Sequence, residues 1–134
     1  MQAVACFFPP TDFQNWSKPG ENFLDYDTTR IFAPAFGPKG ATSEGRQEVE
    51  SKISPINFVT VQMPPTLIFH GDADDIVPLY QSRIFEQKCR DVGAPFKLVV
   101  KPSAGHCEKF GNVMKEMAES AAWFDEYLLR NSAN

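Results

Sequence analysis

The chain has 134 residues, of which 43% are hydrophobic, enough for one domain with a single core and too few for two. Its 13 Lys and Arg residues and 17 Asp and Glu residues give a formal net charge of −4, without a basic stripe. This balance excludes nucleic acid as an expected partner. No stretch reaches the roughly 18 apolar residues of a membrane span, so we expect a soluble protein, cytoplasmic or secreted.

The three cysteines, Cys6, Cys89 and Cys107, stand at wide spacings along the chain. An odd number in this arrangement fits neither a disulfide framework nor a CxxC metal site. We therefore expect buried or incidental thiols.

The first predicted element is a short strand over residues 2–8, an apolar run that Pro9 and Pro10 close. A continuous apolar run of this length is typical of a buried strand in a parallel sheet. Its outer edge would expose unpaired backbone groups if neighbouring strands were missing. We therefore expect association through this edge, as a homodimer or as a complex of fragments.

The hydrophobic pattern weakens between residues 11 and 55, where Gly-Pro pairs and scattered aromatic residues surround one short helix that we predict near residues 44–53. A plain connection of that length would be unusual. We therefore predict that about residues 14–55 form a cap or pocket-lining insertion within one domain. Phe13 and Trp16 fit either a wall of an acyl or aryl pocket or packing inside the insertion.

The second half of the chain alternates strands and helices. Thr66 to Phe69 is strand-like, Pro78 opens a helix that Gly93 closes, and Phe96 to Val100 is the next strand. A last helix places Val113, Met117, Ala121, Phe124 and Leu128 on one apolar stripe. This order implies an α/β fold with parallel strands and right-handed crossover helices.

Two polar residues follow the last two predicted strands. Asp74 lies just beyond the strand that ends at Phe69, and His106 lies just beyond the strand that ends at Val100. Loops at the carboxyl ends of neighbouring parallel strands converge, so this carboxylate can reach this imidazole. Such a pair suits an acid that orients a general base, which takes a proton from a serine hydroxyl.

These segments resemble the α/β-hydrolases. Residues 64–78, which read Pro-Pro-Thr-Leu-Ile-Phe-His-Gly-Asp-Ala-Asp-Asp-Ile-Val-Pro, resemble the acid-loop signature H-G-x-x-D-x-x-V-P. The likeness is greatest to esterases and lipases near the feruloyl and acetylxylan esterases, and to prolyl-oligopeptidase-like peptidases. The resemblance implies that Asp74 is the catalytic acid, with Asp72 and Asp75 as second choices. Ala104 to His106 is similar to the base loop of the family.

The nucleophile of that family has no counterpart in this sequence. The resemblance implies a Ser-Asp-His order along the chain, with the serine in a Gly-x-Ser-x-Gly turn that these residues lack. We therefore expect the C-terminal portion of an α/β-hydrolase, whose nucleophile elbow and oxyanion loop would precede Met1. Ser43, in Ala41-Thr-Ser-Glu-Gly45, is a poor match to that turn. Cys6 and Cys107 are poorly placed to replace a serine.

The resemblance implies a carboxylic-ester hydrolase that uses a Ser-His-Asp triad on a small-molecule ester, without a metal or an organic cofactor. Asp74 and His106 would be the catalytic residues present. Three alternatives stay open: a non-catalytic truncated or degenerate hydrolase module, a prolyl-oligopeptidase-like serine peptidase fragment, and a magnesium-binding pair of Asp72 and Asp74. The isolated chain is expected to be inactive. For His70, which precedes a glycine at a strand end, we expect a structural hydrogen-bonding role.

Overall fold

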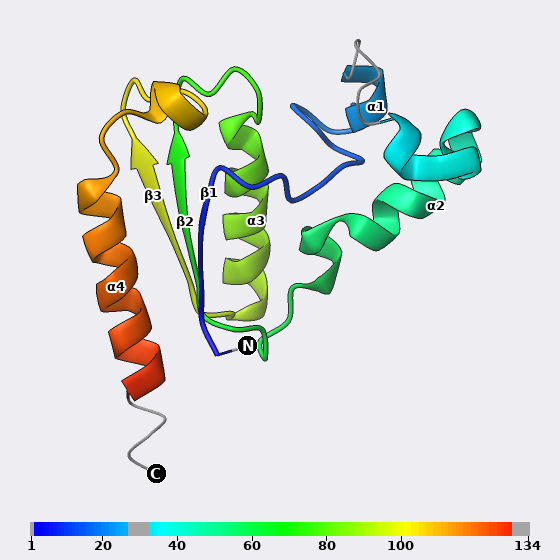
Figure 1. Cartoon of the computed structure of the whole chain (residues 1–134). Coiled ribbons are helices and arrows are strands. Elements are labelled where there is room, and N and C mark those ends of the chain that lie inside the picture. The colour runs from blue at the N-terminus through cyan, green and yellow to red at the C-terminus, as the bar shows by residue number, and fades with distance from the viewer. Residues whose placement is uncertain (1, 27–32, 130–134) are drawn as a thin grey trace. The chain divides into compact units, whose positions relative to one another are not determined.

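A computed structural model describes residues 2–26 and 33–129 of the chain. Three parallel strands form one sheet in the order β1-β2-β3, and two long helices cover its two faces (Figure 1). The elements are β1 (Val4–Phe7), β2 (Thr66–Gly71), α3 (Leu79–Val92), β3 (Phe96–Lys101) and α4 (Met114–Leu129). The predicted α/β class with parallel strands is confirmed. In the described ranges, no helix combines the length and apolar character needed to cross a bilayer.

The central strand, β2, lies between β1 and β3, and α3 and α4 cover its two faces. It is therefore buried along its whole length. Its pairing with β1 places Thr66 opposite Val4, and its pairing with β3 places Gly71 opposite Lys101. The edge strand β1 is only half-buried. Because the strands are parallel, their carboxyl ends lie at one rim of the sheet, which is where the loops after β2 and β3 meet.

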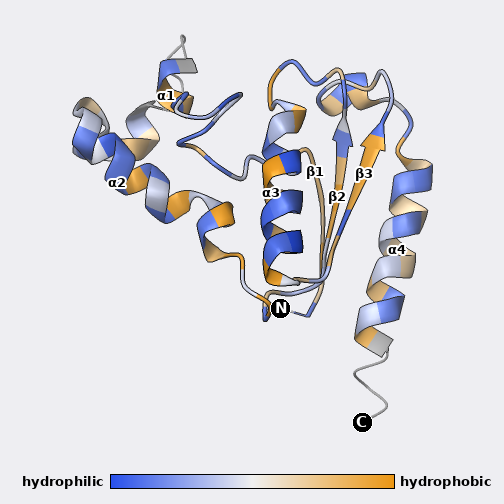
Figure 2. Cartoon of the chain, turned by 180° about the vertical axis from the view of Figure 1, so that it is seen from behind, coloured by the Kyte–Doolittle hydropathy of each residue, from blue (hydrophilic) through white to orange (hydrophobic). Residues whose placement is uncertain are grey.

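Alternate side chains of β2 serve the two faces of the sheet. Leu67 and Phe69 point toward α4 and form a core cluster with Trp123 and Phe110. His70 points to the opposite face, where it contacts α3. The hydropathy colouring of Figure 2 shows apolar residues along the strands and polar residues on the outer surface of α3. The sheet therefore carries a hydrophobic core on the α4 side and a buried polar residue on the α3 side.

The predicted apolar stripe of the last helix is wrong in its register. Met117 is 58% exposed, whereas Glu116 and Trp123 are buried against the sheet. Trp123 supplies a large apolar surface and donates its indole N–H to the Pro65 carbonyl, and Glu116 pairs with Lys101 on β3. These contacts turn the helix, so that of the predicted stripe only Phe124 packs against the core.

The chain divides into two compact units, one made of the residues up to Pro9 and from Val59 onward, the other of Pro10–Phe58. The second unit contains α1 (Phe23–Tyr26), η1 (Ala33–Ala41), α2 (Ser43–Ile53) and η2 (Pro55–Phe58). The helix predicted near residues 44–53 is confirmed as α2. Thr42 caps it by accepting the Gly45 amide.

An aromatic cluster forms the interior of the Pro10–Phe58 unit. Trp16, Phe23 and Phe36 are buried, and Phe13 stacks on Trp16 at a centroid distance of 6.2 Å. Of the two predicted roles for Phe13 and Trp16, the structure therefore supports packing inside this segment. Residues 27–32 of the predicted insertion lie outside the described residues, and its role as a cap or pocket lining stays a prediction.

Glu50 of α2 is buried without full compensation. The Asn22 side-chain amide donates to Oε2, but within the described ranges Oε1 has no hydrogen-bond partner. Burial raises the pKa of Glu50 to about 7, because the ionised carboxylate loses its hydration. This pKa exceeds that of an unfolded glutamate, so the folded chain binds the proton more tightly. The resulting stability is complete below about pH 4 and is lost as the pH rises through 7.

Glu50→Gln is therefore expected to remove this loss and to stabilise the chain at pH 8 relative to the parent by roughly 1–3 kcal/mol. At pH 5 the difference should largely vanish. Urea unfolding followed by Trp16 fluorescence, in a Trp123→Phe background, measures this at both pH values. Glu44→Gln, an exposed change on the same helix, serves as the control. An equal effect of Glu50→Gln at both pH values would contradict the argument.

Candidate active site

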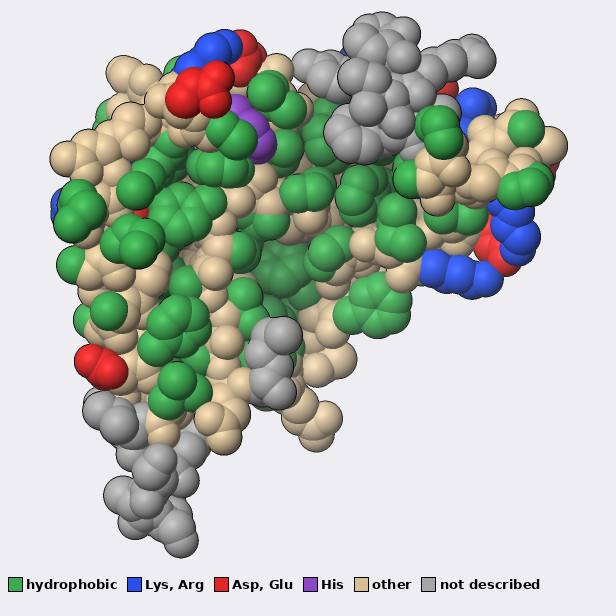
Figure 3. Space-filling view, viewed as in Figure 1, with side chains coloured by type: hydrophobic (Ala, Val, Ile, Leu, Met, Phe, Trp, Pro, Cys, Tyr) green, Lys and Arg blue, Asp and Glu red, His purple; other side chains and the backbone are tan. Residues whose placement is uncertain are grey.

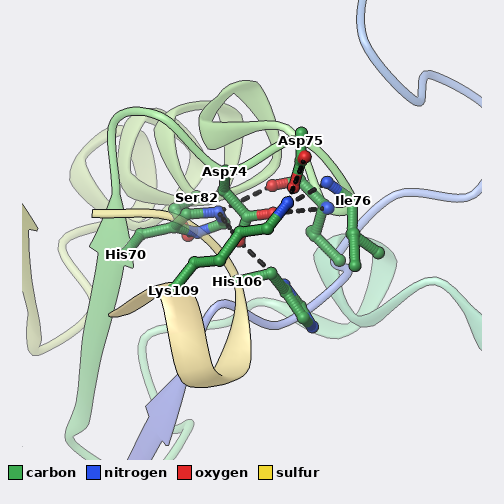
Figure 4. Close-up of polar contacts among 8 residues, drawn as sticks. His70, Asp74, Asp75, Ile76, Ser82, His106 and Lys109 are labelled. Carbon is green, nitrogen blue, oxygen red and sulfur yellow. Dashed lines mark hydrogen bonds and ion pairs between the residues drawn. The ribbon is translucent and has the colours of Figure 1, made fainter. Parts of the chain in front are cut away.

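The candidate site lies at the rim where β2 and β3 end. We call residues 72–78 the β2 loop and residues 102–106 the β3 loop. Asp74 of the first and His106 of the second point toward each other, with Nδ1 of His106 2.8 Å from Oδ2 of Asp74 (Figure 4). The Asp74 side chain is fully buried, whereas that of His106 is 16% exposed. A partly exposed imidazole is thus hydrogen-bonded to a buried carboxylate.

The β2 loop folds around the Asp74 carboxylate. Its Oδ1 accepts the backbone N–H groups of Ile76 and Val77, each at 2.9 Å, which leaves Oδ2 for His106. Because a carboxylate oxygen accepts, Nδ1 of His106 carries the hydrogen, and Nε2 is left with its lone pair. Within residues 2–26 and 33–129, no hydrogen bond reaches that Nε2. The imidazole can therefore accept a proton there.

The two loops are fastened to each other independently of this pair. Gly71 lies so close to the β3 loop that a Cβ at this position would stand 2.0 Å from the Ala104 carbonyl oxygen. Hydrogen bonds from backbone and side-chain groups extend this contact between the loops. They join the Ala73 amide to the Ala104 carbonyl at 3.0 Å and the Ser103 amide to Asp72 Oδ1 at 2.6 Å. Just beyond the β3 loop, Lys109 Nζ pairs with Asp75 Oδ2 at 2.7 Å.

Phe8 covers one side of the imidazole. Its ring centroid is 4.3 Å from that of His106, with the two planes tilted by 50°. Phe8 follows the end of β1 with φ at 39°, a left-handed conformation that is costly for an aromatic residue. Strained residues of this kind often occur at functional sites. With this backbone conformation, the Phe8 ring lies against His106 at the rim.

The structure separates the candidate residues into two groups. Asp74 and His106 come together as expected, whereas the bonds of Asp72 and Asp75 go to Ser103 and Lys109. Asp72 and Asp74, the two residues considered as magnesium ligands, thus both accept hydrogen bonds from N–H groups. Ser43 begins α2 in the Pro10–Phe58 unit. Sequence reasoning missed the Phe8 ring contact, for which the apolar run before Pro9 gave no signal.

The cysteines differ in their surroundings. Cys89 is buried, Cys6 is half-buried in β1, and Cys107 is exposed beside His106. Burial raises the pKa of both Cys6 and Cys89 to about 11, so these thiols remain protonated and unreactive at neutral pH. In the part of the chain that the structure describes, no three His, Cys, Asp or Glu side chains converge as a metal site would require.

Sequence comparisons match this chain to one family model and to esterases. The model of the BD-FAE family matches residues 1–89. Esterase LipQ of Mycobacterium tuberculosis is 46% identical over 41 residues, which cover 31% of this chain and 10% of LipQ. Esterase LipC of the same organism is 36% identical over 66 residues, or 48% of this chain and 16% of LipC. The matched region is thus a small part of each curated relative.

Solved structures match most of the chain. The truncated form of a carbohydrate esterase from gut microbiota has a TM-score of 0.57 at 26% identity, over 89% of this chain and 42% of that one. A puromycin-hydrolyzing peptidase of M. tuberculosis reaches a TM-score of 0.73 at 22% identity, over 96% and 18%. Butyrate-bound esterase 2 of Thermogutta terrifontis gives 0.63 at 21%, over 92% and 43%. The chain covers less than half of each.

Proposed function

Because the chain belongs to the BD-FAE family and has the α/β-hydrolase fold, we propose that it supplies the acid and the base of a serine-dependent carboxylic-ester hydrolase. The observation that carries the proposal is the bond between Asp74 Oδ2 and His106 Nδ1, with Nε2 left open. The names of the matched esterases, LipQ and LipC, favour an ester as the substrate. The substrate would be a small-molecule ester.

In the proposed reaction, His106 Nε2 accepts the proton of a serine hydroxyl while the serine oxygen attacks the ester carbonyl carbon. Asp74 stabilises the imidazolium that forms. His106 then gives the proton to the departing alkoxide, so that the alcohol leaves and an acyl-serine remains. Water, activated by the same nitrogen, hydrolyses the acyl-serine and restores the serine hydroxyl.

The serine itself is proposed to arrive on a strand that pairs with the open edge of β1. The amides of Val4 and Phe8 donate toward β2, so alternation turns the backbone groups of Ala5 and Phe7 to the outer edge. In Figure 3, hydrophobic side chains gather on the side of the sheet where β1 lies. An open edge with apolar surroundings favours pairing with a further strand. A second copy of the chain is the alternative occupant.

The test joins this chain to the part of the carbohydrate esterase from gut microbiota that it does not cover, which is proposed to supply the serine. This joined protein is expected to hydrolyse p-nitrophenyl acetate, and the chain alone should not. A folded joined protein that leaves both this ester and an aminoacyl p-nitroanilide intact would favour a non-catalytic module. Preferred cleavage of the anilide would favour a peptidase. Sedimentation of the chain alone shows whether a second copy occupies the β1 edge.

A further inference from the structure

His70 is completely buried at the end of β2, between the β2 loop and α3 (Figure 4). Its Nε2 is 2.9 Å from the Val77 carbonyl oxygen, and its Nδ1 is 2.7 Å from the Ser82 hydroxyl. A backbone carbonyl can only accept, so Nε2 carries the hydrogen, and Nδ1 accepts the hydroxyl hydrogen of Ser82. Burial lowers the pKa of His70, which agrees with a neutral ring that holds one hydrogen.

The same Nε2 also faces Asp74. It lies 3.5 Å from Oδ2, the oxygen that binds His106, while the amide of Val77 binds the other oxygen. Val77 is thus held from two sides: its carbonyl by His70 and its N–H by Asp74. Replacing the His70 ring would break the bond that holds the β2 loop backbone at Val77. It would also remove the N–H group, with its partial positive charge, that lies beside Asp74 Oδ2.

We propose that His70, held in its Nε2–H form by Ser82, is a positioning residue that keeps Asp74 Oδ2 directed at His106 Nδ1. This inference rests on the proposed function for its catalytic meaning, but the geometry it describes belongs to the chain itself. A merely space-filling His70 would tolerate any substitution of similar volume. A positioning His70 requires an N–H donor at the location of Nε2.

Two amide substitutions separate these roles. The side chain of glutamine in His70→Gln can place an N–H near the position of Nε2 and keep the bond to Val77. The shorter side chain of asparagine in His70→Asn reaches only the Nδ1 region, where it can bind Ser82 but not Val77. Both variants introduce an amide into the same buried site, so they are matched for polarity. They differ in volume, and His70→Leu, which is close to histidine in volume but has no N–H donor, separates loss of the donor from loss of volume: like His70→Asn, it should lose the His106 proton signal.

The chain contains two histidines, so an imidazole ¹⁵N spectrum holds two ring systems, which a His106→Gln variant assigns. In the unsubstituted chain we expect His70 as the Nε2–H tautomer and His106 as the Nδ1–H tautomer with a slowly exchanging proton. His70→Gln should keep the His106 proton signal, and His70→Asn should lose it to fast exchange. An unchanged His106 signal in His70→Asn would overturn the proposal.

If the His70 variants fail to fold, the unsubstituted chain still decides: a His70 ring with its hydrogen on Nδ1 would also overturn the proposal. In the joined protein, His70→Asn is expected to lower kcat about tenfold or more with little change in KM, and His70→Gln should recover much of the loss. A joined protein without activity, but with both tautomers as expected, would count against the proposed ester hydrolysis and not against the role of His70.

Discussion

Asp74→Asn is expected to lower kcat of the joined protein for p-nitrophenyl acetate by about 10⁴-fold while leaving its fold intact. The buried carboxylate now accepts the Nδ1 hydrogen of His106 at 2.8 Å. An amide in its place can turn its NH₂ group toward Nδ1, which must then become the acceptor. The ring hydrogen moves to Nε2, the nitrogen that is proposed to take the serine proton, so His106 can no longer act as the proposed base.

Asp75→Asn is the matched control, because it makes the same change one residue along the β2 loop. Asp75 is exposed and pairs with Lys109, which lowers the pKa of its carboxyl. Exposed pairs contribute little, so we expect less than about a fivefold change in kcat. Steady-state kinetics of both variants, with the His106 tautomer read by ¹⁵N spectra, make the comparison. A large loss with Asp75→Asn and none with Asp74→Asn would transfer the acid role to Asp75.

The elements of the second half of the chain were predictable because local signals agree with tertiary packing there. Pro78 and Gly93 bracket α3, and Gly93 adopts the left-handed conformation that ends helices. The register of α4 was not predictable from spacing alone. Met117 and Trp123 are both apolar, and the buried face is set by tertiary contacts: the core packing of Trp123, its bond to Pro65 and the ion pair of Glu116.

The candidate site shows the same division. The meeting of Asp74 and His106 follows from the rule that loops after neighbouring parallel strands share one rim. The hydrogen-bonding role expected for His70 is confirmed, but its partner Ser82 is 12 positions away on the next helix and had no sequence signal. The left-handed Phe8 is likewise a product of tertiary packing. Sequence therefore identifies the proposed acid and base more readily than the residues that hold them in place.

Gly71→Ala is expected to destabilise the chain by about 3 kcal/mol or more, because it overpacks a contact that cannot yield easily. A Cβ at this position would lie 2.0 Å from the Ala104 carbonyl oxygen and 2.5 Å from its carbon. Both are backbone atoms, so a rotamer change cannot relieve the clash. The β2 and β3 loops would have to separate, and the bond between Asp74 and His106 should weaken with them.

Gly93→Ala provides the comparison, since a Cβ there meets no atom within 4 Å but must adopt φ at +72°. Its cost should be the left-handed penalty alone, about 1 kcal/mol. Urea unfolding followed by Trp123 fluorescence in a Trp16→Phe background measures both changes, and the slowly exchanging His106 proton reports on the site. Only Gly71→Ala should lose that proton signal, because Gly93 lies at the far end of α3. Equal destabilisation by the two substitutions would mean that the loops do not approach as closely as the structure describes, and the preassembly of the acid and base would lose its main support.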